Sequence, residues 1–348
     1  MEQLQAPARL PGLDAARAVA LWCTLTFHFN VSVQAACPGA PVVGFMHYAG
    51  GELGHIGVTL FFVLSGAALM HRYEAACTPG GYYKKRLLAI YPMYWAGFLA
   101  LFLYSDILHH NLPAGVPLRR LIWSALALDG YIQEVLPTFY KIGEWFIGCI
   151  ILLYLVFPLL RIALLKKPAL LAAALVFFHV GWVLFYPGVV QIEHSAASRL
   201  LEFAAGMYLA RYWKRLPRWA PFAGCAAALL VLLVPLPGPR MFWLPLLGAG
   251  MFLILMWAGE FITACWARIA LQKIAQLSYP LYLVHHVTLT ILFVPRLNGH
   301  ILGLGGVWAI YFLYLATAAL AAAALQVVAK AVQKAGWVLA GKKVAVRR

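Results

Sequence analysis

The sequence predicts an all-α integral membrane protein, a bundle of about ten transmembrane helices forming a single domain over residues 1–348. Hydrophobic residues make up 64% of the chain and charged residues only 11%, which is far more apolar than a soluble domain. The apolar residues fall in runs of roughly 18 to 25, the length that crosses a bilayer as a helix. Because no water-soluble segment between them is long, we expect no second domain.

Ten such runs follow one another along the chain. The first contains Asp14 and Arg17 and lacks a small-residue cleavage site behind a basic start, so we expect it to stay in the mature protein rather than act as a signal peptide. The predicted spans are residues 13–34, 54–72, 85–108, 142–161, 168–187, 197–212, 219–235, 241–260, 276–295 and 303–328.

The basic residues predict the orientation of this bundle. With the N-terminus inside, the inner segments hold 20 of the 27 Lys and Arg residues, including a basic tail from about residue 330. The positive-inside rule therefore puts both termini in the cytosol. This topology accounts for the net charge of +16, so we expect no nucleic-acid partner.

The segment 118–132 is apolar but too short to span. It begins with two arginines, and counting it as a span would invert the later loops. We therefore predict an outer re-entrant or interfacial helix.

Motifs for several enzyme classes are absent from the sequence. The six cysteines form no CxxC pair and the histidines no HExxH pattern, so we expect neither a metal site nor disulfides. The lack of GxSxG, Walker and GxGxxG motifs speaks against serine hydrolases, NTPases and dinucleotide enzymes.

Ionisable groups inside a bilayer are costly and usually functional. Arg17 and His28 are eleven residues apart, so on a helix they share one face about 16 Å apart, and Asp14 lies one turn before Arg17. This spacing suits a long ligand that enters from inside, with its phosphates at Arg17 and its reactive end at His28. The alternative is an interfacial salt bridge and a histidine that bonds a neighbouring helix.

The ninth predicted span holds a second polar group. Successive residues on a helix point in different directions, so at most one of two adjacent histidines faces a given cavity; a polar packing seam is the alternative. The group consists of Ser278, Tyr279, Tyr282, His285 and His286.

Two other positions carry charge near or within spans. Arg199 and Glu202, three residues apart, most simply form an intrahelical ion pair. Glu144, at the outer end of the fourth span, is either a general base or a solvated helix end.

Six segments occur in order along nearly the whole chain: Leu13-Asp14-Ala-Ala-Arg17 running to His28, Gly57-Val-Thr-Leu-Phe-Phe-Val-Leu-Ser65-Gly66, Lys85-Arg86-Leu-Leu-Ala-Ile-Tyr91-Pro92, Trp145-Phe-Ile-Gly with Tyr154-Leu-Val-Phe157-Pro158, Glu202-Phe-Ala-Ala-Gly206-Met, and Leu277-Ser-Tyr-Pro-Leu-Tyr-Leu-Val-His285-His286. Together they resemble the membrane acyltransferase 3 family of bacterial O-acyltransferases of polysaccharides and glycosides. The first segment is similar to the family's Arg-x10-His signature.

The resemblance implies a multi-pass enzyme of the bacterial cytoplasmic (inner) membrane. It would move an acyl group, acetyl by default, from cytosolic acyl-CoA to a hydroxyl of a sugar or polysaccharide on the periplasmic or extracellular side. The implied partners are acyl-CoA as co-substrate, a carbohydrate acceptor, membrane lipid, and a second copy of the chain or polysaccharide-synthesis machinery.

The resemblance also implies roles for residues. His28 would be the catalytic histidine with Arg17 essential beside it; from the spacing along the span, and not from the resemblance, we expect Asp14 to orient Arg17. Lys84, Lys85 and Arg86, with Tyr91, would bind the coenzyme A phosphates. Independently of the resemblance, the residues themselves are our candidates for contacting the substrate: Glu144, Ser65, Tyr279, Tyr282, His285 and His286.

The chain departs from the family pattern in three places. Ala89 replaces a second arginine, so phosphate binding would rely on the two lysines before Arg86. Thr59 stands where many members have Asp, and Ile150 and Ile151 where others carry Glu.

For the mechanism we favour His28 as general base over an acyl-imidazole carrier, because direct transfer needs only one positioned imidazole. Arg17 or the hydroxyls of Ser65, Tyr279 and Tyr282 would stabilise the oxyanion. The rival reading is a ten-helix transporter or flippase of a lipid-linked sugar, but the two halves show no clear internal repeat. Such a protein would not consume a thioester.

Overall fold

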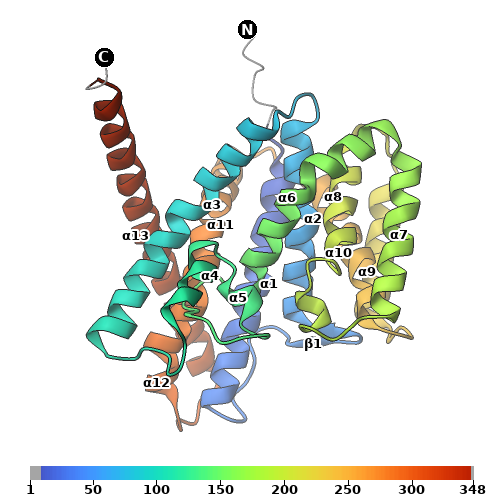
Figure 1. The fold of residues 1–348 in the computed structure, drawn as a ribbon. Helices are drawn as coiled ribbons and strands as arrows, with labels where there is room; N and C mark the ends of the chain where they lie inside the picture. The colour runs from blue at the N-terminus through green and yellow to red at the C-terminus, as the bar shows by residue number, and fades with distance from the viewer. Residues whose placement is uncertain (1–8, 346–348) are drawn as a thin grey trace.

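The computed structural model describes residues 9–345, with side chains for residues 9–334, and this part of the chain is almost entirely helical (Figure 1). A short hairpin, β1 (His47–Tyr48) with β2 (Gly51–Glu52), pairs antiparallel. The α-helices are α1 Pro11–Ala36, α2 Leu53–Tyr73, α3 Pro79–Phe102, α4 Leu121–Ala125, α5 Asp129–Ile132, α6 Glu144–Lys166, α7 Pro168–Leu184, α8 Leu200–Tyr212, α9 Ala220–Leu233, α10 Leu244–Glu260, α11 Cys265–Thr288, α12 Val294–Leu297 and α13 Leu304–Ala345.

Shorter helical turns join or extend these helices. Wider π-helical turns extend α3 over η1 (Leu103–Leu108) and α11 over η6 (Leu289–Phe293). Tight 3₁₀ turns occur at η2 Leu118–Arg120, η3 Ile192–His194, η4 Trp213–Arg215 and η5 Arg240–Phe242.

The all-α membrane class is confirmed, and each of the ten predicted spans falls on a helix. Among the described residues, six helices are long and apolar enough to cross a membrane: Leu53–Tyr73, Pro79–Leu108, Glu144–Lys166, Arg240–Glu260, Cys265–Leu297 and Leu304–Lys334. Two apolar helices, α7 and α9, are shorter. Of the other two, α8 has only 13 residues, and the 26 residues of α1 include several polar side chains.

The predicted interfacial helix at 118–132 is interrupted in the structure. It comprises the turn η2, then α4 and α5, with a break at Ala127, whose φ of 56° is left-handed. This conformation is incompatible with a continuous α-helix, so the chain turns between the two short helices.

Basic residues from separate predicted inner segments gather at one end of the bundle. Arg161 donates to the backbone carbonyls of Tyr73 and Glu74, and Arg211 donates to the Glu74 carboxylate at 3.0 Å. We call this the basic end; α1 begins there and α13 ends there (Figure 1). The β-hairpin and α12 lie at the opposite end.

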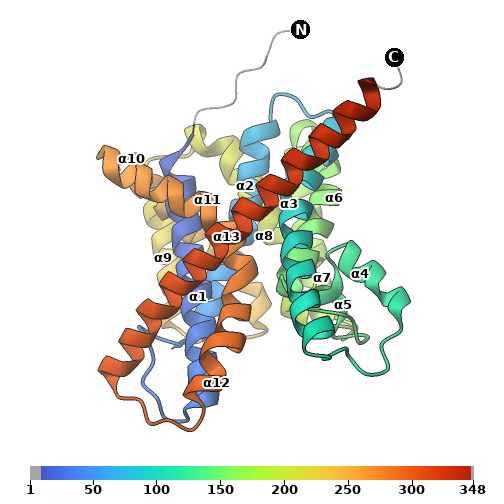
Figure 2. The ribbon, with the colours of Figure 1, turned by 90° about the vertical axis from the view of Figure 1, so that its left-hand side faces the viewer.

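Close helix packing holds the centre of the bundle. A Cβ atom on Gly66 of α2 would lie 1.8 Å from the Phe203 carbonyl oxygen, and one on Gly206 of α8 would lie 1.8 Å from that of Val63. Small residues at helix crossings allow such approach, which is how helices associate within a bilayer. α1 packs between α2, α10 and α11, while the long α13 crosses obliquely over α3 and α11 (Figure 2).

The outward faces of the bundle are apolar. Phe177 and Phe185 of the α7 region, Leu233 at the end of α9 and Leu320 of α13 are each more than two-thirds exposed. Side chains of this kind are expected where the surrounding solvent is lipid rather than water.

Candidate active site

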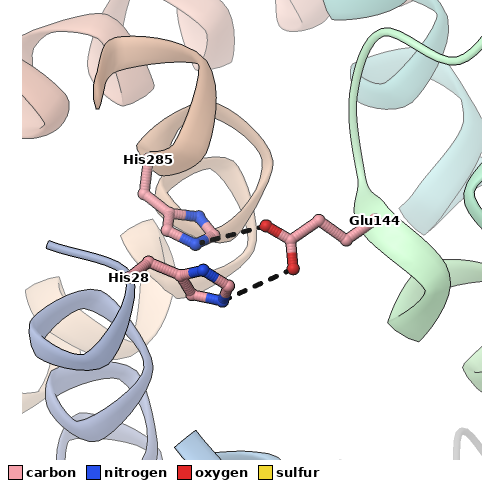
Figure 3. Close-up of side chains that lie close together, drawn as sticks. All are labelled: His28, Glu144 and His285. Atoms are coloured by element: carbon pink, nitrogen blue, oxygen red, sulfur yellow. Dashed lines mark ion pairs between the residues drawn. The ribbon is translucent and has the colours of Figure 1, made fainter. Parts of the chain in front are cut away.

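A carboxylate and three imidazoles meet at the centre of the bundle. The Glu144 Oε2 atom lies 3.5 Å from His28 Nε2, and its Oε1 atom lies 3.7 Å from His285 Nε2 and 3.5 Å from His286 Nδ1. Figure 3 shows the two rings of His28 and His285 side by side, both facing Glu144 from the other side of the gap. Helices α1, α6 and α11, far apart in sequence, supply these groups.

A strained stretch of backbone positions Glu144. Gly143 has φ 91°, and Glu144 itself has φ 43°, a conformation that residues with a side chain rarely adopt. The backbone of α5 presses against this point, because a Cβ on Gly130 would lie 2.3 Å from the Glu144 carbonyl oxygen. Strain of this kind persists where surrounding structure enforces it, often at functional sites.

The two adjacent histidines occupy different environments. His285 is fully buried, and its Nδ1 atom lies 2.7 Å from the Tyr282 carbonyl oxygen, while its Nε2 has no hydrogen-bond partner among the described residues. His286 is partly exposed and lines a cavity. Only one of the pair therefore faces the cavity, yet both reach the same carboxylate, which helical directions alone did not predict.

The same atoms have the chemistry of metal ligands. One donor atom each from His28, Glu144 and His285 lie within 4.8 Å of one another, and His286 adds a further nitrogen beside Glu144. Histidine nitrogens with one carboxylate form a donor set that suits zinc or iron. The separations of 3.5 to 3.7 Å equally suit imidazoles sharing one proton acceptor.

A polar cavity of about 570 Å³ opens onto this cluster from the end opposite the basic end. We call it the histidine cavity. Besides the cluster, polar and aromatic side chains form its wall, among them Tyr140, Trp145, Glu193, Arg199 and Arg240. Burial and the adjacent Glu144 carboxylate raise the pKa of Tyr140, so its phenol stays protonated beside the cluster.

A second cavity, of about 340 Å³, lies toward the basic end. Three guanidinium groups line it, those of Arg17, Arg72 and Arg86, and we call it the arginine cavity. The rest of its wall is mainly apolar, with Ser65 and Tyr279 among the few polar side chains.

Tyr282 is the residue that lines both cavities. Its ring centroid lies 5.0 Å from that of Phe146 and 6.3 Å from that of Phe61, and both phenylalanines line the arginine cavity. A small aromatic cluster therefore separates the arginines from the histidines.

The predicted donor residues take separate positions. Arg86 lines the arginine cavity, whereas Lys85 lines a third cavity beside it and Lys84 lines neither. The Tyr91 hydroxyl donates to the Leu126 carbonyl at 3.0 Å and lines none of these cavities. Of this predicted group, Arg86 is therefore the residue that lines the arginine cavity.

Two predicted acceptor residues line the arginine cavity instead of the histidine cavity. These are Ser65 and Tyr279, and the Tyr279 hydroxyl already donates to the Ile90 carbonyl at 3.0 Å; Ser278, from the polar group of the ninth predicted span, lines the same cavity. Of the residues whose hydroxyl groups were considered for oxyanion stabilisation, Tyr282 is the one that lines both cavities.

Asp14 contacts both nearby arginines. Its carboxylate lies 2.7 Å from Arg9 Nε and 3.4 Å from Arg17 Nη1, so it pairs with Arg17 as the spacing predicted. The predicted ion pair of Arg199 with Glu202 also forms, at 2.8 Å and fully buried. Arg199 has a further role in the wall of the histidine cavity, under Trp145.

Sequence reasoning missed Arg72, Phe61, Phe146 and Tyr140. Arg72 had a readable signal, because it lies seven residues after Ser65 on α2 and therefore on the same helix face. The other three depend on how separate helices meet, which no spacing within one helix shows.

Comparison with known proteins gives one finding on identity. A family model described as an acyltransferase domain matches residues 10–326. No curated protein and no solved structure matches the chain.

Proposed function

Since this chain belongs to the acyltransferase 3 family and is an acyltransferase, we propose that it transfers an acyl group, acetyl by default, from acyl-CoA to a hydroxyl group of a sugar or polysaccharide. The donor would come from the cytosol and the acceptor from the outer side of a bacterial cytoplasmic membrane. One observation carries the proposal: a cavity lined by arginines and a cavity lined by histidines meet at Tyr282.

The arginine cavity suits the donor. A guanidinium group binds phosphate oxygens through charge-assisted hydrogen bonds, and three of them line this cavity. Its apolar wall suits the uncharged arm and short acyl chain of the coenzyme. By the positive-inside rule, the basic end, at which this cavity lies, would face the cytosol.

The histidine cavity suits a carbohydrate. A sugar hydroxyl both donates and accepts hydrogen bonds, and this cavity offers carboxylates, guanidinium groups and a phenol. Its opening at the end opposite the basic end would admit a glycan from outside.

The chemistry follows from the contact between Glu144 and His28. The carboxylate beside Nε2 favours the tautomer with its proton on that nitrogen, which leaves Nδ1 to accept a proton. As the acceptor oxygen attacks the thioester carbon, a C–O bond forms and the hydroxyl proton passes to His28. The C–S bond then breaks, and the proton passes to the departing sulfur of coenzyme A.

Two groups near the reaction would stabilise developing charge. Glu144 would stabilise the imidazolium of His28, and the Tyr282 phenol, which borders both cavities, would donate to the thioester oxyanion. We assign the cluster to proton transfer rather than metal binding because this reaction needs a base and an acid, and three imidazoles share one carboxylate. Turnover should then survive metal chelators; its loss, with recovery on adding zinc, would reverse this assignment.

The proposed function is tested by the release of free coenzyme A from acetyl-CoA by purified protein in detergent, with and without a glycan extract. We expect release that depends on the extract and is lost in His28→Ala, while binding of acetyl-CoA survives. Turnover that is unchanged in His28→Ala would remove this residue from the mechanism. Absence of release with acetyl-, succinyl- and longer acyl-CoA would favour a transporter.

A further inference from the structure

A third cavity, which we call the basic chamber, lies at the basic end beside the arginine cavity and measures about 1050 Å³. Five Lys or Arg side chains line it together with a single carboxylate, that of Glu74. The five are Arg72, Lys85, Arg211, Lys214 and Arg215. Three of them come from the end of α8 and the turn η4, a segment that no motif of the sequence pointed to.

The positive charge of the chamber is poorly neutralised by the protein. Glu74 pairs with Arg211 at 3.0 Å, but the Nε atom of Arg211 is buried without a hydrogen-bond partner. Arg72, Lys214 and Arg215 have no carboxylate partner in the part of the chain that the structure describes. The chamber therefore keeps a net positive charge, which attracts an anionic ligand that enters it.

The chamber adjoins the arginine cavity. Arg72 lines both, and the adjacent residues Lys85 and Arg86 line one each. A single ligand can therefore place an anionic end in the chamber and extend an uncharged arm past Arg72 into the narrower cavity. Trp213 adds an indole to the chamber wall, on which a nucleobase can stack.

We propose that the basic chamber binds the adenosine 3′,5′-bisphosphate end of coenzyme A, with Lys214 and Arg215 of η4 and Arg211 of α8 contacting its phosphates. This inference rests on the proposed use of acyl-CoA, and it adds a binding segment separate from the Lys84–Arg86 run. The chamber matches the polyanionic end of the donor, and the arginine cavity matches its arm.

The test compares three donors that differ only in their nucleotide end: acetyl-CoA, 3′-dephospho-acetyl-CoA and S-acetyl-4′-phosphopantetheine. The variant is Lys214→Gln/Arg215→Gln. We expect its KM for acetyl-CoA to rise about 10- to 100-fold with kcat unchanged, as loss of one or two charge-assisted contacts predicts. Its KM for S-acetyl-4′-phosphopantetheine should equal that of the wild type.

Lys166→Gln/Lys167→Gln is the matched control, because these two basic residues, the last of α6 and the one that follows it, line neither the chamber nor the arginine cavity. This control variant should leave the KM values for all three donors unchanged. Equal KM values for acetyl-CoA in wild type and Lys214→Gln/Arg215→Gln, or an equal rise for all three donors, would overturn the proposal.

Binding of adenosine 3′,5′-bisphosphate, measured by calorimetry in detergent, separates this inference from the proposed function. Binding to the wild type and not to the η4 variant supports the chamber even if no donor is turned over, in which case only the proposed function fails. Absence of binding to the wild type overturns the chamber assignment whatever the turnover shows.

Discussion

Glu144→Gln tests whether the carboxylate drives the reaction through His28. Glutamine has nearly the same volume, so the substitution removes charge without opening a cavity. The carboxylate oxygen lies 3.5 Å from His28 Nε2. At an effective dielectric constant of about 20, two unit charges at this separation attract by about 5 kcal/mol, which is lost when the imidazolium forms beside an amide.

Because Glu144 also faces His285 and His286, its attraction for the His28 imidazolium is weaker than that of an isolated pair. We therefore expect Glu144→Gln to remove about 3 to 4 kcal/mol of stabilisation of the imidazolium. This corresponds to a fall in kcat of roughly 10²- to 10³-fold. The KM for acyl-CoA should stay unchanged, because Glu144 lines the histidine cavity and not the arginine cavity. Release of coenzyme A at saturating donor and acceptor measures the loss.

Glu193→Gln is the matched control for this experiment. Glu193 is a second carboxylate in the wall of the histidine cavity, but it lies 3.8 Å from Arg240 instead of beside His28. We expect its kcat to stay within a few-fold of wild type. A Glu144→Gln enzyme with kcat within threefold of wild type, or one altered only in donor KM, would refute the role given to this carboxylate.

Three further predictions address mechanism and stability. Rapid mixing with acetyl-CoA alone should give no burst of coenzyme A, because His28 acts as a base; a burst of one equivalent per enzyme would indicate an acyl-histidine. Gly206→Ala should lower the melting temperature in detergent by several degrees, because the added Cβ would have no room. Gly305→Ala should not lower it, because an added Cβ there meets nothing within 4 Å. Equal melting temperatures for the two variants would contradict the close packing of α2 and α8. Burial raises the pKa of the Asp129 carboxyl in the folded protein above its value in the unfolded chain. This group therefore favours the folded state most below about pH 4, where it is protonated in both states, and that contribution is lost as the pH rises through the folded-state pKa. Asp129→Asn, which still accepts from the Tyr94 hydroxyl, should therefore gain in melting temperature relative to wild type as pH rises, and a constant difference across pH would exclude this effect.

The hydrophobic pattern predicted where helices run but not where they end. The predicted ninth span starts at residue 276, whereas α11 begins at Cys265, and the predicted tenth ends at residue 328, whereas α13 continues to Ala345. In both cases the apolar run ends at charged residues, but the helix continues past them. A helix is also stable where one of its faces is exposed to water. Length and composition support six of the ten spans, since short or polar helices can also lie within a membrane bundle.

The site was predictable where it depends on one helix. Arg17 and His28 follow from spacing along α1, and each lines one of the two cavities. The approach of Glu144 to His28 was not predictable, because it depends on the left-handed backbone at Gly143 and on the contact with α5. Contacts between segments that are far apart in the sequence produce no periodic pattern, so one sequence alone does not predict them.

The position of both Arg17 and His28 on α1 bears on how a donor is selected in the proposed reaction. A continuous helix is rigid, so the separation of the two side chains along its axis stays at about 16 Å. A thioester at His28 whose pantetheine-linked phosphate lies at Arg17 must therefore carry an extended arm of that length through the aromatic cluster at Tyr282. A thioester too short to span this separation cannot contact Arg17 while its reactive carbon lies at His28. The acyl group then reaches the histidine cavity attached to its carrier, and no charged part of the donor has to leave the basic end.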